Sequence, residues 1–345
     1  MICTPAPTVP GLINECGEKG IRAVIILSAG FGEVGGDGQA LQKQVTDAAR
    51  AFDGLRIVGP NCLGAIVPAI GLNASFAAGT PETGHLAFVS QSGALCTSVL
   101  DWAMQQHIGF SHFISIGNML DVTFADLIDY FGQSPQTRSI MLYIESITDA
   151  RQFMSAARAF SRTKPIIAYK AGRFPRSAKA AMSHTGALAG EDDVYDAAFQ
   201  RAGIERVFEV GDMFECAELL ARHRVPPGER LAIVTNAGGP GVMACDALIA
   251  HRGELANLSD ETIARLNQIL PAQWSKGNPV DILGDAPPDR YAHATRLGLA
   301  DGGVDTVLVI LTPQAMTDPT AAAEQVAEVA RKTQKAVLTA WMGGE

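Results

Sequence analysis

The sequence has few cysteines, and their positions follow no recognisable pattern. The six lie at 3, 16, 62, 96, 216 and 245, with no CxxC pair and no spacing typical of a zinc site or a disulfide framework. We therefore expect reduced thiols in a cytoplasmic protein, and no metal site. No apolar run approaches the roughly 18 residues needed to span a bilayer, and MICTPAPTVP lacks the features of a signal peptide. A membrane is therefore not an expected partner.

Basic residues are outnumbered by acidic ones. The chain has 27 Lys and Arg against 36 Asp and Glu, a net charge of −9, and no long basic run, so nucleic acid is not an expected partner. What is present is a globular composition, with 47% hydrophobic and 18% charged residues and 35 glycines. A length of 345 residues is enough for two or three domains.

Short apolar runs alternate with helical patterns along the whole chain. Their apolarity is nearly continuous, as in parallel strands covered on both faces. We expect nine such strands, at 21–30, 55–61, 85–91, 109–117, 139–146, 164–172, 230–238, 304–312 and 335–343. Helical patterns lie between them, for example at 124–131, 149–162 and 320–333. This alternation predicts an α/β protein with doubly wound parallel sheets.

An internal repeat divides the chain. LAFVSQSGALCTSVLDWA (86–103) matches LAIVTNAGGPGVMACDAL (231–248). Further matches follow in the same order: Asn118–Asp121 with Asn278–Asp281, SIMLYI (139–144) with TVLVIL (306–311), and KPIIAYKAG (164–172) with KAVLTAWMG (335–343). We predict a domain at 84–227 and a similar one at 228–345, joined at a Pro-Pro-Gly linker. Residues 1–83 form a third unit. Both ends of the chain are expected to be cut.

Both repeats place a glycine-bearing turn between the first strand and the next helix. Open α/β sheets bind ligands at the carboxyl ends of their strands, and a helix N-terminus there suits a phosphate. The candidate phosphate-binding residues are Ser90, Ser92 and Gly93 in the first turn and Gly238, Gly239 and Gly241 in the second. Neither turn is a Walker A loop. A tight turn with an N-cap serine is the structural alternative.

Two further polar residues follow strands of the first repeat. Glu145 ends SIMLYIE, and His184 lies in SHTGALAG (183–190), after the next strand. Both are therefore expected at the carboxyl edge of one sheet. A carboxylate that holds one imidazole nitrogen leaves the other free to attack a phosphoryl group. The structural alternative for the histidine is a surface position near a turn.

With these residues the chain resembles the α-subunit region of NDP-forming acyl-CoA synthetases, the family of ADP-forming acetate–CoA ligase and succinyl-CoA synthetase. The resemblance rests on VGPNCLG (58–64), FVSQSGAL (88–95), Glu145 and 164–190, and TNAGGPG with NPVD in the second repeat resembles the ligase-CoA domain. It implies a partial Rossmann-like CoA-binding unit followed by two flavodoxin-like domains. It also implies that His184 becomes phosphorylated and that Glu145 orients it. Gln91 would bind phosphate together with Ser90, Ser92 and Gly93, at the helix start that receives the phosphoryl group.

The resemblance implies a ligand site for CoA and the acyl group as well. Its residues would be Ser28, Gly30, Asn61, Cys62, Gly117 and Asn118. From the residue alone, Cys62 is better interpreted as a buried thiol than as a nucleophile.

The implied reaction interconverts acyl-CoA, ADP and phosphate with a carboxylic acid, ATP and CoA, through an acyl phosphate and a phosphohistidine. ATP or ADP and Mg²⁺ would be bound by an ATP-grasp domain or β-subunit, which this sequence does not contain. We expect an oligomer, and a chain that does not turn over by itself. The alternative function is a non-catalytic CoA- or acyl-CoA-sensing region of a protein lysine acetyltransferase. His184 favours the ligase, because the acetyltransferase branch commonly lacks this histidine.

Overall fold

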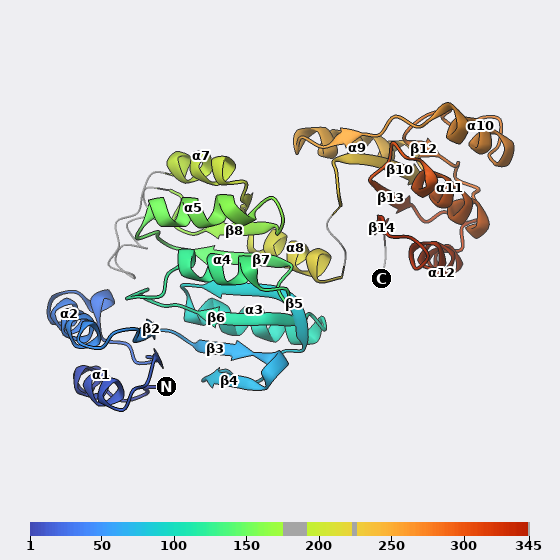
Figure 1. Cartoon of the computed structure of the whole chain (residues 1–345). Helices are drawn as coiled ribbons and strands as arrows, with labels where there is room; N and C mark the ends of the chain where they lie inside the picture. The colour runs from blue at the N-terminus through green and yellow to red at the C-terminus, as the bar shows by residue number, and fades with distance from the viewer. Residues whose placement is uncertain (175–191, 223–225, 344–345) are drawn as a thin grey trace. The chain divides into compact units, whose positions relative to one another are not determined.

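The computed structural model describes residues 1–174, 192–222 and 226–343. The chain forms two compact units, 1–222 and 223–345 (Figure 1). Among the described residues, no helix is long and apolar enough to cross a bilayer.

The first unit is built on a seven-stranded sheet in the order β4-β3-β6-β5-β7-β8-β9. Its strands are β3 (Gly64–Val67), β4 (Leu72–Ser75), β5 (Thr83–Ser90), β6 (Phe110–Ser115), β7 (Ser139–Ile144), β8 (Ile166–Lys170) and β9 (Glu205–Val207). The five neighbouring strands β6, β5, β7, β8 and β9 are parallel. Strand β3 pairs antiparallel with both β4 and β6. The central strands are buried nearly throughout, because helices cover both of their faces.

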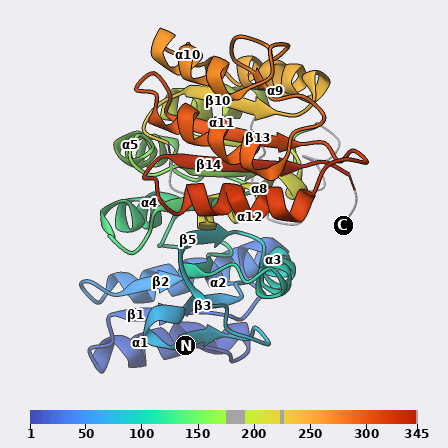
Figure 2. The same ribbon diagram turned by 90° about the vertical axis from the view of Figure 1, so that its right-hand side faces the viewer.

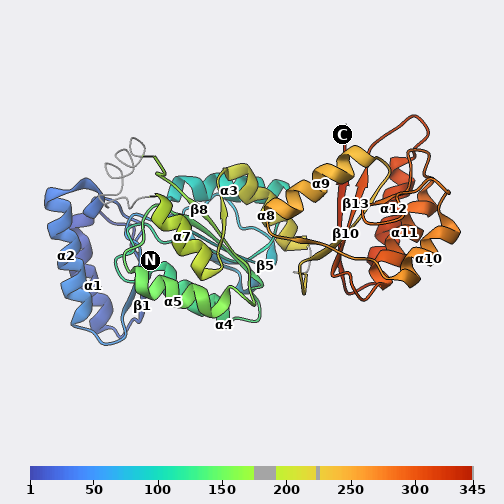
Figure 3. The same cartoon turned by 90° about the horizontal axis from the view of Figure 1, so that it is seen from above.

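Helices lie on both faces of this sheet (Figure 3). One face is covered by α4 (Phe124–Gln133), α5 (Ala150–Phe160) and α7 (Asp192–Ala202), the other by α3 (Gly93–Gln105) and α8 (Val210–Arg222). Local capping fixes where the helices begin. The Asp149 carboxylate accepts a hydrogen bond from the Gln152 backbone at the start of α5, and Thr123 and Asp126 form a capping box at α4.

A smaller α/β layer precedes this sheet in the chain. It contains α1 (Val9–Glu18), β1 (Ala23–Ile25), α2 (Gly36–Arg50) and β2 (Arg56–Val58), with short 3-10 helices at Ala6–Thr8 and Gly32–Val34. A third 3-10 helix, Pro68–Ile70, connects β3 and β4 of the large sheet. Strands β1 and β2 are parallel. The loop after β6 hydrogen-bonds to this layer, because the Asn118 and Leu120 backbone N–H groups donate to the Pro60 and Gly59 carbonyls. The smaller layer is thereby held at the carboxyl edge of the large sheet.

The second unit is a parallel sheet of five strands. They are β10 (Arg230–Thr235), β11 (Glu254–Leu255), β12 (Val280–Asp281), β13 (Thr306–Leu311) and β14 (Ala336–Trp341), in the order β11-β10-β13-β14, with β12 also on β10. Figure 2 shows β10, β13 and β14 one above another. Helix α9 (Gly238–Ala250) lies on one face, and α10 (Asp260–Ile269), α11 (Pro288–Ala300) and α12 (Pro319–Ala330) on the other (Figure 3).

Strand pairing supports the internal repeat. Leu86 lies opposite Ser139 and Ile140 opposite Ile166 in the first unit. The residues matched to them in the second repeat are paired in the same way: Leu231 with Thr306 and Val307 with Val337. The α/β fold class and all nine expected strands are confirmed. Strands β3, β4, β9, β11 and β12 were not expected from the sequence.

One match within the repeat was wrong. In the second unit Asp281 pairs with Thr235, the residue matched to Ser90. In the first unit Ser90 pairs with Ser115. Asp281 is therefore the counterpart of Ser115 and not of Asp121. The helix α10 and its flanking loops come between β11 and β12, and this insertion shifted the sequence match. The predicted boundaries at 83/84 and 227/228 stay predictions, and β3 and β4 precede the first of them.

Candidate functional site

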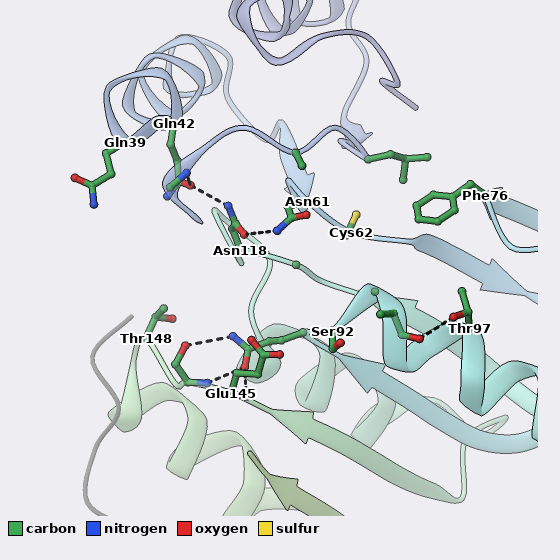
Figure 4. A pocket seen from close by; sticks show the side chains of 18 residues that line it. Gln39, Gln42, Asn61, Cys62, Phe76, Ser92, Thr97, Asn118, Glu145 and Thr148 are labelled. Atoms are coloured by element: carbon green, nitrogen blue, oxygen red, sulfur yellow. Dashed lines mark hydrogen bonds between the residues drawn. The ribbon is translucent and has the colours of Figure 1, made fainter. Parts of the chain in front are cut away.

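A cavity of about 880 Å³ lies at the carboxyl edge of the first unit's sheet. Its walls come from the smaller N-terminal layer, the first turn of α3 and the loops after β6 and β7 (Figure 4). Eight of the candidate residues line it: Asn61, Cys62, Gln91, Ser92, Gly93, Gly117, Asn118 and Glu145. Residues from four separate stretches of sequence are thus brought together.

Ser90 and Ser92 shape the turn that leads into α3. The Ser90 hydroxyl donates to the Ser92 carbonyl at 2.9 Å and accepts from the Ser92 backbone N–H at 3.0 Å. The Ser92 hydroxyl accepts from the Leu95 N–H at 3.3 Å, which makes Ser92 the N-cap. Ser90 is buried and does not line the cavity, so its hydroxyl serves the turn.

The first turn of α3 opens onto the cavity. Gly93, Ala94 and Thr97 line it. A Cβ added at Gly93 would lie 3.6 Å from the Leu63 backbone nitrogen, an ordinary contact, so protein packing does not require glycine there. The missing side chain leaves the start of the helix open to a ligand. The positive end of the helix dipole at this point favours an anion.

Gln91 holds the turn that carries Glu145. Its side-chain oxygen accepts hydrogen bonds from the backbone N–H groups of Glu145 at 2.6 Å and Ser146 at 2.9 Å. Its side-chain nitrogen donates to the Ser146 hydroxyl at 3.3 Å. The carboxamide that we assigned to phosphate is therefore engaged with the protein. In this structure Gln91 acts on the position of Glu145, and its assignment to phosphate stays a prediction.

Glu145 is half-buried at the edge of the cavity, directly after β7. Figure 4 shows it beside Thr148, with Gln42, Asn61 and Cys62 on the other side of the cavity. Its charge acts on its surroundings. Burial raises the pKa of Tyr143 to about 12, and the negative charge of Glu145 adds to that effect. The sequence correctly placed this carboxylate at the carboxyl edge of the sheet.

His184 and the rest of residues 175–191 lie outside the described residues. The predicted contact between His184 and Glu145 therefore stays a prediction. The described chain reaches Phe174 shortly after β8 and resumes at Asp192, the first residue of α7.

Glu33 joins two loops of the cavity region, a role that the sequence analysis missed. Its carboxylate accepts hydrogen bonds from the Gly30 backbone N–H at 2.6 Å and from the Asn118 side chain at 2.5 Å. The Asn118 side-chain oxygen accepts from Asn61 at 3.3 Å. Burial by itself would raise the pKa of Glu33, but hydrogen bonds from Asn118, Gly30 and Phe31 bring it below its ordinary value. The sequence did contain a signal for this role, because Glu33 is the one acidic residue among the small residues of SAGFGE (28–33).

Two glycines of this region are required by the backbone. Gly30 has φ +107°, and Gly117 has φ +50°, where a side chain is strained. A Cβ at Gly117 would also lie 2.1 Å from the Pro60 carbonyl oxygen. Ser28 donates to the Thr4 carbonyl at 2.5 Å and does not line the cavity. Ser28 and Gly30 thus shape the loop, while Asn61 and Asn118 present amides to the cavity.

Cys62 lines the cavity as a buried thiol. It is 3% exposed, and its Sγ donates to the Ile26 carbonyl at 3.3 Å. Burial raises its pKa to about 12, so the thiol stays protonated near neutral pH and is a poor nucleophile. All six cysteines are free thiols. Within the described ranges, no cluster of three or more metal-binding side chains is present.

The second unit repeats the α3 turn at the start of α9. Thr235 donates to the Ala237 carbonyl at 2.8 Å and accepts from its N–H at 3.1 Å, as Ser90 does with Ser92. Gly238 and Gly93 are each the first residue of their helix. Gly239 has open space around a Cβ position, whereas a Cβ at Gly241 would lie 3.0 Å from Thr235 Cγ2. Packing therefore accounts for Gly241.

Three family models match the chain in succession. A CoA binding domain matches residues 1–68, a succinyl-CoA ligase like flavodoxin domain matches 83–220, and a Ligase-CoA domain matches 231–340. These matches define a protein of the succinyl-CoA synthetase-like class.

Relatives narrow the class. The ADP-forming acetate–CoA ligase I of Archaeoglobus fulgidus is 41% identical over 100% of this chain and 49% of its own length. The α-subunit of ADP-forming acetate–CoA ligase I of Pyrococcus furiosus is 40% identical over 100% of this chain and 74% of its own length. The chain thus spans about half of the first relative and three quarters of the second.

The comparison with solved structures supports the same class. The dinucleotide-forming acetyl-coenzyme A synthetase 1 of Ca. Korarchaeum cryptofilum, in complex with phosphate and ADP, superposes with a TM-score of 0.93 at 34% identity, covering 99% of this chain and 74% of that one. The chain belongs to the family of ADP-forming acyl-CoA synthetases, and the resemblance read from its motifs is confirmed.

Proposed function

We propose that this chain is the part of an ADP-forming acyl-CoA synthetase that carries the phosphohistidine. The observation that carries the proposal is the cavity in which Glu145 and the first turn of α3 lie together. A carboxylate and an anion-binding helix start are what a histidine needs to take up and pass on a phosphoryl group. The relatives are named as ligases, so the acetyltransferase-linked sensing function is not favoured.

The proposed reaction has three reversible transfers. Phosphate attacks the acyl-CoA thioester, the carbon–sulfur bond breaks, and an acyl phosphate and CoA result. An imidazole nitrogen of His184 then attacks the phosphorus atom, and the phosphorus–oxygen bond to the acyl group breaks to release the carboxylic acid. Finally the phosphoryl group passes from His184 to ADP and forms ATP. In these steps the N-cap Ser92 and Gly93 receive the phosphate, and Glu145 holds the second nitrogen of the imidazole.

The cavity walls favour an acyl group without a second negative charge. Among the described residues that line the cavity, none is Lys or Arg. A dicarboxylic acid would leave its second carboxylate unpaired there, which is costly. Asn61 and Gln42 instead place neutral carboxamides in the wall, whereas the Asn118 carboxamide is bonded to Glu33, Gln42 and Asn61. We therefore propose a small monocarboxylic acid as the substrate class.

CoA would enter at the side of the cavity formed by the N-terminal layer, next to Asn61 and Cys62. ATP or ADP and Mg²⁺ would be held by an ATP-grasp domain or β-subunit, the partner that we propose for this chain. The second helix start, at Gly238 to Gly241, would receive the phosphoryl group in the same enzyme. We further propose an oligomeric enzyme of the cytoplasm.

The experiment is phosphoryl labelling of the complete enzyme that contains this chain. Incubation with γ-labelled ATP and Mg²⁺ is expected to give an acid-labile, base-stable label on His184, identified by mass spectrometry of the peptide. His184→Ala should abolish both the label and ligase turnover. His293→Ala is the matched control, since His293 is an exposed residue of α11. Undiminished label in the His184→Ala protein would show that another residue carries the phosphoryl group.

A further inference from the structure

A second charged side chain lies at the carboxyl edge of the same sheet. Lys170 is the last residue of β8 and is only 1% exposed. The strand register places it opposite Ile144, the residue before Glu145. A buried ammonium is costly unless charges or hydrogen bonds compensate it. Its presence at the end of an apolar strand therefore calls for a function.

The surroundings of Lys170 come from three other elements. Its ammonium lies 4.6 Å from the centre of the Tyr195 ring on α7 and donates to the Ala171 carbonyl. Burial lowers the pKa of Lys170, and the Arg206 charge on β9 adds to this, whereas the carboxylates of Asp192 on α7 and of Glu145 oppose it. Asp192 is the stronger of the two opposing charges, and the strand register places Glu145 directly after the residue opposite Lys170.

Another buried cation near this edge, Arg206, is already paired with carboxylates of α7. Its guanidinium is paired with Asp192 at 2.5 Å and with Asp196 at 3.3 Å. Tyr195 also interacts through its hydroxyl with the backbone N–H of Ile147, in the loop that follows Glu145. Tyr195 thus connects α7 with the loop that follows Glu145, and Lys170 lies over the ring of the same tyrosine.

The internal repeat separates what the fold requires from what the site requires. In the second unit, Trp341 lies opposite Leu311, just as Lys170 lies opposite Ile144. The residue that follows Leu311 is Thr312, the counterpart of Glu145. The same sheet edge is thus built without either charge. The carboxylate and the ammonium occur together in one repeat and are both absent from the other.

We propose that Lys170 is a positioning residue for Glu145, whose buried ammonium keeps the carboxylate ionised and in place during phosphoryl transfer. This inference rests on the proposed function, in which Glu145 holds the imidazole that is phosphorylated. A protonated Glu145 could not accept the imidazole N–H as a charged partner. The counter-charge of Lys170 makes protonation of Glu145 harder and so extends the acidic range in which the site works.

The test uses Lys170→Met in the complete enzyme, with Lys164→Met as the matched control. Lys164 lies just before the other end of β8, and its ammonium donates to the Phe131 and Ser134 carbonyls. The rate of His184 labelling is measured against pH. We expect Lys170→Met to move the acid limb of the profile upward by on the order of one pH unit. Lys164→Met should leave the limb where it is. An unmoved limb in a folded Lys170→Met enzyme would overturn the proposal.

A double variant tests whether Lys170 acts through Glu145. In a Glu145→Gln background, Lys170→Met should not alter the residual rate or its pH dependence further. Independent and additive effects of the two changes would contradict the proposal.

A third arm covers a Lys170→Met protein that does not fold. NMR titration of isotopically labelled lysine in the full chain compares the wild type with Glu145→Gln, and we expect a lower Lys170 pKa in the variant. An unchanged value would refute the coupling. The NMR titration does not depend on enzyme activity. Absence of label from the wild-type enzyme would refute the proposed function and would leave the coupling between Lys170 and Glu145 to be decided by the titration.

Discussion

The side-chain oxygen of Gln91 lies 2.6 Å from the backbone nitrogen of Glu145, from which it accepts a hydrogen bond. The two residues directly follow different strands, β5 and β7, and Gln91 also accepts from the next N–H, that of Ser146. The turn that presents the carboxylate is therefore held in place from the turn between β5 and α3. The second repeat keeps this arrangement, since Asn236 bonds both the N–H and the carbonyl of Thr312.

The first prediction concerns this support. Gln91→Leu has a similar volume but leaves two N–H groups without their acceptor, which is expected to cost about 1–3 kcal/mol of unfolding free energy. The displaced Glu145 should also slow labelling of His184. Urea denaturation and the labelling rate measure the two effects. Asn236→Leu is the comparison in the second unit, with a similar loss of stability expected. A Gln91→Leu enzyme with unchanged labelling would show that the turn holds its place without Gln91.

The second prediction separates the carboxylate of Glu145 from its backbone. Glu145→Gln keeps the N–H that donates to Gln91, so the thermal unfolding midpoint should stay close to that of the wild type. The amide cannot support the imidazole by charge, and both labelling and turnover should fall on the order of 10²-fold. The control is Glu82→Gln, because Glu82 is exposed just before β5, near the opposite sheet edge. Equal activity of Glu145→Gln and wild type would remove Glu145 from the site.

The third prediction concerns the pH dependence of the Glu33 link. Because the folded-state pKa of Glu33 is lowered, its carboxylate stabilises the fold above its unfolded pKa, and this contribution is lost as the pH falls through the folded value. Glu33→Gln should therefore cost about 1 kcal/mol at pH 7 and progressively less below the ordinary value of 4.5. Denaturation at several pH values measures this difference. Glu15→Gln, at an exposed site on α1, is the control. A loss of unfolding free energy in Glu33→Gln that does not change with pH would contradict the ionic character of the bond between Glu33 and Asn118.

The fourth prediction concerns Asp301 in the second unit. Burial would raise its pKa, but hydrogen bonds from the Ser259 and Gly303 backbone and from the side chains of Thr262 and Ser259 lower it to about 2. Its stabilising contribution should be complete above 3.8, its ordinary value, and should disappear as the pH falls toward 2.

Asp301→Asn tests this with thermal melts between pH 2 and pH 7. The destabilisation relative to wild type should be largest near neutral pH and should shrink in acid. Asp246→Asn, at an exposed site on α9, is expected to change little at any pH. A gap between Asp301→Asn and wild type that widens in acid would mean that the pKa of Asp301 is raised and not lowered.

Local sequence was enough for the nine expected apolar strands, for the start of α3 and for the family. Parallel strands that are covered on both faces must be apolar along their length, so runs such as SIMLYI are visible without the fold. The Ser92 cap depends on a residue only three positions away. The position of Glu145 followed from one rule, that a polar residue directly after a buried parallel strand lies at the carboxyl edge of the sheet.

The partners of these residues were decided only by the tertiary structure. Gln91 and Glu145 are 54 residues apart in sequence, and Glu33 and Asn118 are 85 apart. No local periodicity encodes such a pairing, because it depends on which strands become neighbours. The strands β3 and β4 were missed for a related reason. They are short and pair antiparallel with each other, and they join the large sheet only because β3 pairs with β6, which lies far along the chain. The sequence thus determined which side chains reach the sheet edge. The fold determined that Gln91 supports the turn of Glu145 and that Lys170 is buried at the end of the neighbouring strand. Only the packed structure could decide this, because packing is what removes these groups from water.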